Sequence, residues 1–191
     1  PAPEPALDAR WAQHHLDFNF FGHTGNQHIY YNCDAVEAKV ERLLRLAGAR
    51  KDMKVRAYCA VGPERVAALI RVALDFKSPT LAPQPVPVQA GDTPLPAAAR
   101  WQPVSLRLGG TLGFDQGDCL LVDQFRMQVL KVFDLRNLTV DLPCSVRFGP
   151  PRGRQSLAFE ALTATPTAEK ESIQFEQQPK KHDDKLKSDR S

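Results

Sequence analysis

Apolar residues recur at helical spacing in two stretches of the chain, and each stretch begins at a cysteine. The apolar positions are Val36, Val40, Leu43, Leu44 and Ala47 in the first stretch, and Val122, Phe125, Val129, Leu130 and Phe133 in the second. Asn32 or Asp34, and Asp118, offer side-chain acceptors to the first turns, and Gly48 can end the first helix in a left-handed conformation. The pattern therefore predicts helices that start at Cys33 and at Cys119.

Alternating apolar and polar residues predict strands elsewhere in the chain. These stretches are 16–20, 28–31, 53–59, 66–76, 104–108, 138–144 and 157–162. The first two flank a turn-like GHTGN segment, so we expect a hairpin that leads into the first helix. For the start of the 66–76 stretch, a helix that begins at Pro63 is the alternative, because proline suits a first helical turn.

The four cysteines form two pairs with nearly equal spacing. Cys59 follows Cys33 by 26 residues, and Cys144 follows Cys119 by 25. In each pair the first cysteine starts a predicted helix and the second ends a predicted strand. If the strands before and after such a helix are parallel, the helix starts and the second strand ends at the same end of the sheet. This geometry favours the disulfides Cys33–Cys59 and Cys119–Cys144 over the other pairings.

The two stretches correspond beyond their cysteines, which predicts a duplicated unit. Trp11 and Trp101 precede the helices at similar distances, and each copy ends in a Pro-Thr pair. We expect an α+β fold in which tandem β(β)αββ units at 11–79 and 101–166 form one pseudo-symmetric domain. Its sheet would be antiparallel or mixed, with the helices on one face. The arrangement resembles ferredoxin-like topologies in outline over 11–166, which implies a fold and no function.

The rest of the chain is predicted to lie outside these units. Residues 1–10 read as a mobile lead-in, and 80–100 as a stiff, proline-rich linker. The polar stretch 167–191 has mixed charge and predicts a disordered tail, in which Ile173 and Phe175 are the candidate anchors for a partner.

Composition and charge restrict the function and the compartment. The formal net charge of +3 is too small to indicate nucleic-acid binding, and no apolar stretch is long enough to span a bilayer. An even cysteine count without a Cys-x-x-Cys motif, in a chain that begins PAPEPA, suggests a secreted or periplasmic protein whose signal peptide has been removed.

Histidines provide the candidate metal ligands. Four of the five histidines lie between His14 and His28, and a hairpin can bring His15 and His28 together as ligands for zinc, copper or nickel. Against this prediction, neighbouring histidines on a strand point to opposite faces.

Other candidate chemistry is weaker. Cys33 and Cys119 lie at helix starts, where a thiol would be reactive, but structural disulfides are favoured. The glycines at 109, 110 and 113 lack a phosphate-binding motif, and we treat the sequon at Asn137 as chance.

No catalytic motif such as Gly-x-Ser-x-Gly or His-Glu-x-x-His occurs. We therefore expect an exported, disulfide-stabilised, non-catalytic protein without a cofactor, which binds another protein or the cell envelope. The alternatives are a metal-binding protein that uses the N-terminal histidines, and a hydrolase of unrecognised type.

Overall fold

The computed structural model describes residues 5–24, 27–28, 30–59, 66–67, 69–81, 96–144 and 155–166. These residues form a six-stranded antiparallel sheet, in the order β5-β7-β1-β8-β10-β9, and two helices that pack on it. The strands are β1 (Leu7–Phe21), β5 (Lys54–Cys59), β7 (Leu69–Thr80), β8 (Pro96–Arg107), β9 (Leu135–Asp141) and β10 (Ser156–Ala164). The helices are α1 (Cys33–Leu46) and α2 (Cys119–Gln128), with 3-10 turns at Gln116–Asp118 and Leu130–Val132. Two-residue strands pair outside the sheet: β2 (His23–Thr24) with β3 (Gln27–His28), and β4 (Tyr31–Asn32) with β6 (Val66–Ala67).

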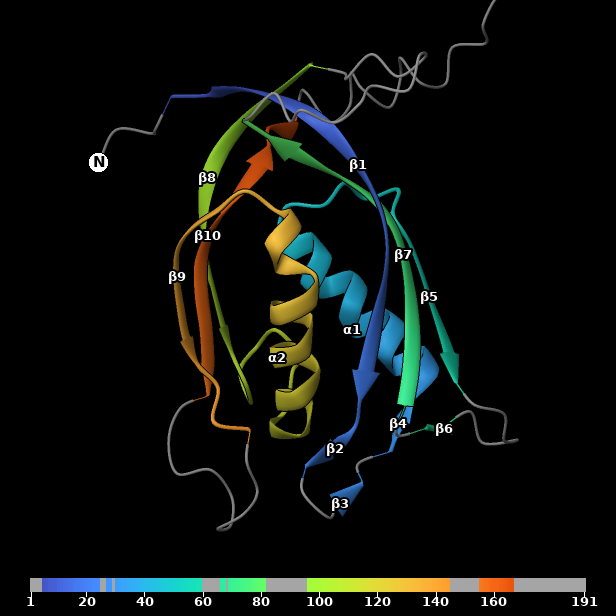
Figure 1. Cartoon of the computed structure of the whole chain (residues 1–191). Coiled ribbons are helices and arrows are strands. Elements are labelled where there is room, and N and C mark those ends of the chain that lie inside the picture. Colours follow the sequence, from blue (N-terminus) through green and yellow to red (C-terminus); the bar gives the residue numbers. More distant parts are fainter. Residues whose placement is uncertain are drawn as a thin grey trace, which may run out of the picture.

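Each half of the chain builds one side of the sheet. β1 and β8 join the two sides, but they pair only over Leu7–Arg10 and Pro96–Ala99. Beyond this short ladder they diverge, and both helices lie in the bend between the two sides (Figure 1). The strand order is the same from either outer edge inward. The second long strand of that half of the chain comes first, the third follows, and the first lies innermost.

The main core fills the bend between the sheet and the helices. From β1, Phe18 and Phe20 point into it, and Phe18 meets Phe125 of α2 edge to face at 6.2 Å between ring centroids. From α1, Leu44 is fully buried in the same core. Because side chains of both halves contribute, the described residues share one core across the two halves.

A second, smaller cluster lies where β1 and β8 pair. It contains Ala9, Trp11, Ala97, Ala99 and Leu162. On β1 the buried residues change from odd positions (Ala9 and Trp11) to even positions (Phe18 and Phe20), so the strand buries opposite faces at its two ends. One long strand therefore serves both clusters.

The divergence of β1 and β8 leaves each strand with an unpaired edge. On β1 this edge is closed by side chains of α2. Asn19 donates its main-chain N–H to Gln128 at 3.3 Å and accepts from the Gln128 amide at 2.8 Å. Phe21 makes the same pair of bonds with Gln124, at 2.9 and 2.8 Å. The two glutamines thus take the place of a neighbouring strand.

The ends of α1 follow the sequence prediction, whereas the predicted cap of α2 is wrong, because the Asp118 side chain makes no capping hydrogen bond to that helix. The Asn32 side chain accepts from the Ala35 N–H at 3.1 Å and caps α1. Gly48 has a φ of 100°, and a Cβ there would lie 2.3 Å from the carbonyl oxygen of Leu162. Only glycine therefore allows the turn after α1 to approach β10 this closely.

Several predicted boundaries differ from the structure. β1 begins at Leu7 instead of near residue 16, and β8 begins at Pro96, inside the stretch expected to be a linker. The predicted hairpin of 16–20 with 28–31 is wrong, because β1 pairs with β7 over Arg10–Phe21 and β3 pairs with β2. The twelve-residue β7 offers more apolar surface than a four-residue strand. The start of a helix at Pro63 and the charged tail with Ile173 and Phe175 lie outside the described residues.

Candidate binding surface

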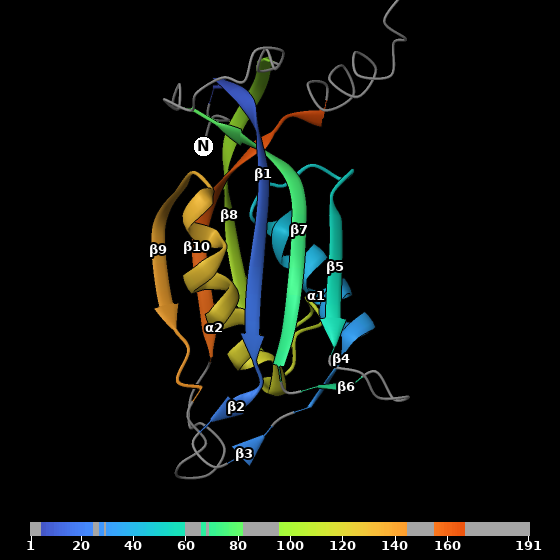
Figure 2. The same ribbon diagram turned by 45° about the vertical axis from the view of Figure 1, so that its right-hand side comes forward.

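The outer face of β5, β7 and β1 is a regular array of polar side chains. Antiparallel register aligns the residues in rows across the three strands, because paired residues share a face. One row contains Lys54, Asp75 and His15, and the next contains Arg56, Ala73 and Asp17. In these two rows, on the face turned away from the helices, the cations lie on β5 and the carboxylates on β7 and β1; Figure 2 shows the three strands side by side.

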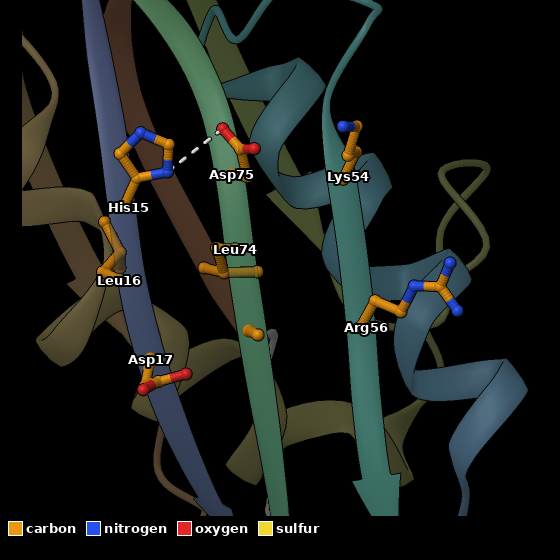
Figure 3. Close-up of a pocket in the computed structure, with 8 residues that line it drawn as sticks. His15, Leu16, Asp17, Lys54, Arg56, Leu74 and Asp75 are labelled. Atoms are coloured by element: carbon orange, nitrogen blue, oxygen red, sulfur yellow. Dashed lines mark ion pairs between the residues drawn. The ribbon is translucent and has the colours of Figure 1, made fainter.

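A shallow depression lies at the centre of this array, because Ala73 is the one small residue among long side chains. Figure 3 shows His15 and Asp75 turned toward each other from β1 and β7, with Lys54 and Arg56 extending from β5. The His15 Nδ1 lies 3.3 Å from the Asp75 carboxylate, and both side chains are exposed. The Gln13 amide also donates to Asp75, at 2.5 Å. The carboxylate is thus held by its neighbours on β1.

An apolar strip adjoins the polar array at the end of β1. Leu69 of β7 is directly opposite Phe21 of β1, and Tyr58 of β5 lies diagonally across from Leu69. The three side chains are 53%, 44% and 57% exposed, respectively. Next to this strip, Arg71 pairs with Asp17 at 2.7 Å. Exposed aromatic and aliphatic groups beside charges of both signs are typical of protein-binding surfaces.

The two adjacent histidines of β1 point in opposite directions. His14 is on the inner face, stacked on Phe76 at 4.9 Å, with its Nε2 2.9 Å from the Ser78 hydroxyl. Burial, with the nearby charge of His15, lowers the pKa of His14, although Asp134 opposes this shift. His15 is on the outer face.

The structure places the two predicted metal ligands on different strands, His15 in β1 and His28 in β3, where His28 pairs with His23. In the described part of the chain, no group of three or more histidine, cysteine, aspartate or glutamate side chains is arranged to hold a metal ion. A site formed by His15 and His28 stays a prediction.

Both predicted disulfides are present. Cys33 at the start of α1 bonds Cys59 at the end of β5, and Cys119 at the start of α2 bonds Cys144 after β9. All four cysteines are therefore paired, which contradicts the alternative that Cys33 and Cys119 are reactive thiols. The geometric argument holds because β1 and β5 are both antiparallel to β7 and hence parallel to each other.

In each half of the chain the guanidinium of an arginine lies over a tryptophan ring. The Arg50 guanidinium lies 5.4 Å from the centre of the Trp11 ring, and that of Arg136 lies 4.7 Å from Trp101. Arg50 is buried and bonds both carboxylate oxygens of Asp52, which lowers the pKa of Asp52. The two pairs stabilise the smaller core cluster, and Arg50 is too deeply buried to contact a ligand.

A second polar cluster links the two helices. Lys39 of α1 donates to the buried carboxylate of Asp118, at the start of α2, at 2.5 Å. The Tyr31 hydroxyl donates to the Gly117 carbonyl at 2.5 Å. Burial, with the charges of Asp118 and Asp115, raises the pKa of Tyr31 to about 12. The cluster therefore keeps Tyr31 protonated and serves as an interhelical contact.

Sequence reasoning did not find the array on β5, β7 and β1. Its residues alternate with the apolar ones that predicted the strands, so the signal was present at positions 13, 15 and 17 and at 71, 73 and 75. What the sequence did not supply was the pairing of β1 with β7, which brings these positions into rows. The sequon at Asn137 is also exposed, because β9 is an edge strand and not a buried one.

Comparisons of the chain with protein-family models, with curated proteins and with solved structures found no match. None of the helices in the described residues is long and apolar enough to cross a membrane.

Proposed function

We propose that the chain acts outside the cytoplasm as a disulfide-stabilised, non-catalytic binding protein, and that the outer face of β5, β7 and β1 contacts a partner protein. The two disulfides support the compartment, because such bonds persist in oxidising surroundings. The observation that carries the binding role is the exposure of this face. No described element covers this face, and it exposes large apolar side chains, since Leu69 and Tyr58 are more than half exposed.

A protein fits this surface better than a lipid surface does. An anionic membrane attracts surfaces on which basic residues dominate. Here the carboxylates of Asp17 and Asp75 lie among the cations Lys54, Arg56 and Arg71, so basic residues do not cover the face on their own. Neither Lys54 nor Arg56 has an acidic partner among the described residues, whereas Asp17 and Asp75 are engaged by Arg71 and His15. We therefore expect carboxylates of the partner to approach β5.

We further propose that the chain contains two copies of a ferredoxin-like βαββ unit. Several features recur at equivalent positions. The sheet order repeats when it is read from each edge, and the arginine–tryptophan pair occurs in both halves. Asn32 and Asp118 each stand directly before the first helical cysteine. Duplication accounts for all three.

Photo-crosslinking in the native cells tests the binding role. A photoreactive residue replaces Leu69 on the outer face, and as a control it replaces Met127 on α2, which is exposed to a similar extent. We expect one defined protein adduct at position 69 and none at 127. Binding of that purified partner should weaken at least about tenfold in the Lys54→Glu/Arg56→Glu variant, as expected for the loss of two charge-assisted contacts.

The matched charge control is Lys131→Glu/Arg107→Glu, in which two exposed cations elsewhere are reversed. Equal weakening by both double variants would contradict a specific role for β5. Adducts with lipid at position 69 would instead support the cell-envelope alternative.

A further inference from the structure

In the first half, helix side chains form hydrogen bonds to the unpaired edges of the strands β1 and β5. On the outer edge of the sheet, Glu37 of α1 accepts from the Ala57 N–H of β5 at 2.8 Å. The residue equivalent to Glu37 in α2 is Asp123, since each stands four positions after the first cysteine of its half. Asp123 bonds Arg126 instead, at 2.7 and 3.0 Å. The opposite edge of the sheet, β9, therefore lacks the contact that closes β5.

The hydrogen-bond pattern shows which main-chain groups of β9 point outward. Leu108 donates to Gln155, and Thr165 donates to Ala98, so odd-numbered residues of β10 bond β8. Even-numbered residues of β10 then bond β9, where their partners are Thr139 and Asp141. Val140 lies between these two partners, so its N–H and C=O groups point away from the sheet. The main-chain groups of Leu138 do the same. No described residue bonds them.

Two apolar side chains on this edge are uncovered. Leu138 is 48% exposed and Val140 is 40% exposed. Val140 shares a face with its partner Leu157, which is buried, so it points toward the helix side. In the first half Val55, the counterpart of Val140, is buried, and Met53, the counterpart of Leu138, is partly buried against the main core. An open edge that combines free main-chain groups with exposed apolar side chains is a template for another strand.

We propose that β9 pairs with β9 of a second copy of this chain, antiparallel about a two-fold axis at Thr139. In this register Leu138 of one copy lies opposite Val140 of the other, and their outward groups form hydrogen-bonded pairs. Asn137 lies opposite Asp141, and Arg136 opposite Leu142, so no like charges meet. This self-complementarity favours a second copy over an unrelated strand.

The resulting dimer is expected to be weak. Asn137 has a φ of 57°, and the β9–β10 register shifts beside it, so the regular edge ends there. A short strand pair buries little surface, as in transient complexes. The proposal is independent of the partner surface, because β9 and β5 are opposite edges of the sheet.

Sedimentation over a wide concentration range tests the proposal with the intact chain. We expect a reversible monomer–dimer equilibrium. Val140→Pro should raise the dissociation constant at least about tenfold, because it removes the outward N–H from both copies. Proline is tolerated at this position because its missing N–H faces away from β10, and the thermal unfolding midpoint of the variant confirms that it folds. Val140→Thr, which keeps the N–H and the branched shape, is the control.

Cysteine crosslinking gives a second, independent readout. Thr139 would face its copy in a non-hydrogen-bonded pair, at about 4.5 Å between Cα atoms, which is short enough for a disulfide. Thr139→Cys should form a covalent dimer under mild oxidation, and Ser105→Cys, exposed on β8, should not. A wild-type monomer at every concentration, a dimer that Val140→Pro leaves unchanged, or equal crosslinking by both cysteine variants would each overturn the proposal.

Discussion

At the scale of single residues, each charge that is buried in the described part of the chain has a partner that neutralises it. Arg50 and Asp118 are each 1% exposed. Arg50 has Asp52 on one side and the Trp11 ring on the other, and Asp118 has Lys39. An unpaired charge at such depth would cost several kcal/mol, so removing one partner should destabilise more than replacing the whole pair by apolar groups.

His14 makes stability depend on pH. Its pKa is lowered by burial and by the charge of His15, so the unfolded chain binds a proton more readily than the folded chain does. Stability from this group is therefore present above the unfolded pKa of about 6.5 and is lost as pH falls through the lower, folded pKa. We expect the free energy of unfolding to decline below about pH 6.5.

The matching variant for this prediction is His14→Gln. Glutamine can still bond the Ser78 hydroxyl but does not titrate. Carboxylates contribute to the pH profile of both proteins, so the difference between their profiles isolates His14. Urea titrations between about pH 5 and pH 7.5 measure it, and parallel profiles would contradict the assignment.

At the scale of elements, local sequence patterns predicted the helices and the disulfides, whereas the arrangement of the sheet depends on which strands pair. The helical periodicity after Cys33 and Cys119 depends on neighbours a few residues apart, so it is visible in the sequence. In β1 the alternation changes phase between Trp11 and Phe18, because the strand buries opposite faces at its two ends. A single period therefore detects only half of this strand. The polar array on β5, β7 and β1 depends on which strands pair, and that information is non-local.

The glutamines on α2 are expected to stabilise the unpaired edge of β1. The double variant Gln124→Ala/Gln128→Ala removes the four bonds to Asn19 and Phe21. Because the site is exposed and alanine favours helix, the net loss of unfolding free energy should be about 1–3 kcal/mol. Hydrogen exchange should also show faster exchange at the two main-chain N–H groups.

A glutamine elsewhere separates this effect from general sensitivity to mutation. Gln102→Ala, on the exposed side of β8, should change the unfolding free energy by less than about 0.5 kcal/mol. Equal destabilisation by Gln102→Ala, or unchanged exchange at Asn19 and Phe21 in the double variant, would show that the glutamines do not replace a strand.

At the scale of the whole molecule, the two halves depend on each other. Asp134, after α2, accepts from the Thr80 hydroxyl at 2.9 Å and from the Leu81 N–H at 2.7 Å at the end of β7. In return, Gly48 of the first half packs on Leu162 of the second. In each half, the loop after the helix contacts the other half. These reciprocal contacts add to the apolar core that the two halves share.

Separating the halves should therefore unfold both. We expect the pieces 1–81 and 96–191, each with its own disulfide, to lack a cooperative unfolding transition alone, because Phe18 would lose Phe125 and Lys39 would lose Asp118. Mixed, they should reassemble, with a melting temperature that rises with concentration, as mass action requires of a two-piece complex. Calorimetry and near-ultraviolet circular dichroism measure both properties. A cooperative transition in an isolated half would mean that the βαββ unit holds its own core, and the shared bend would then be a docking surface between two domains.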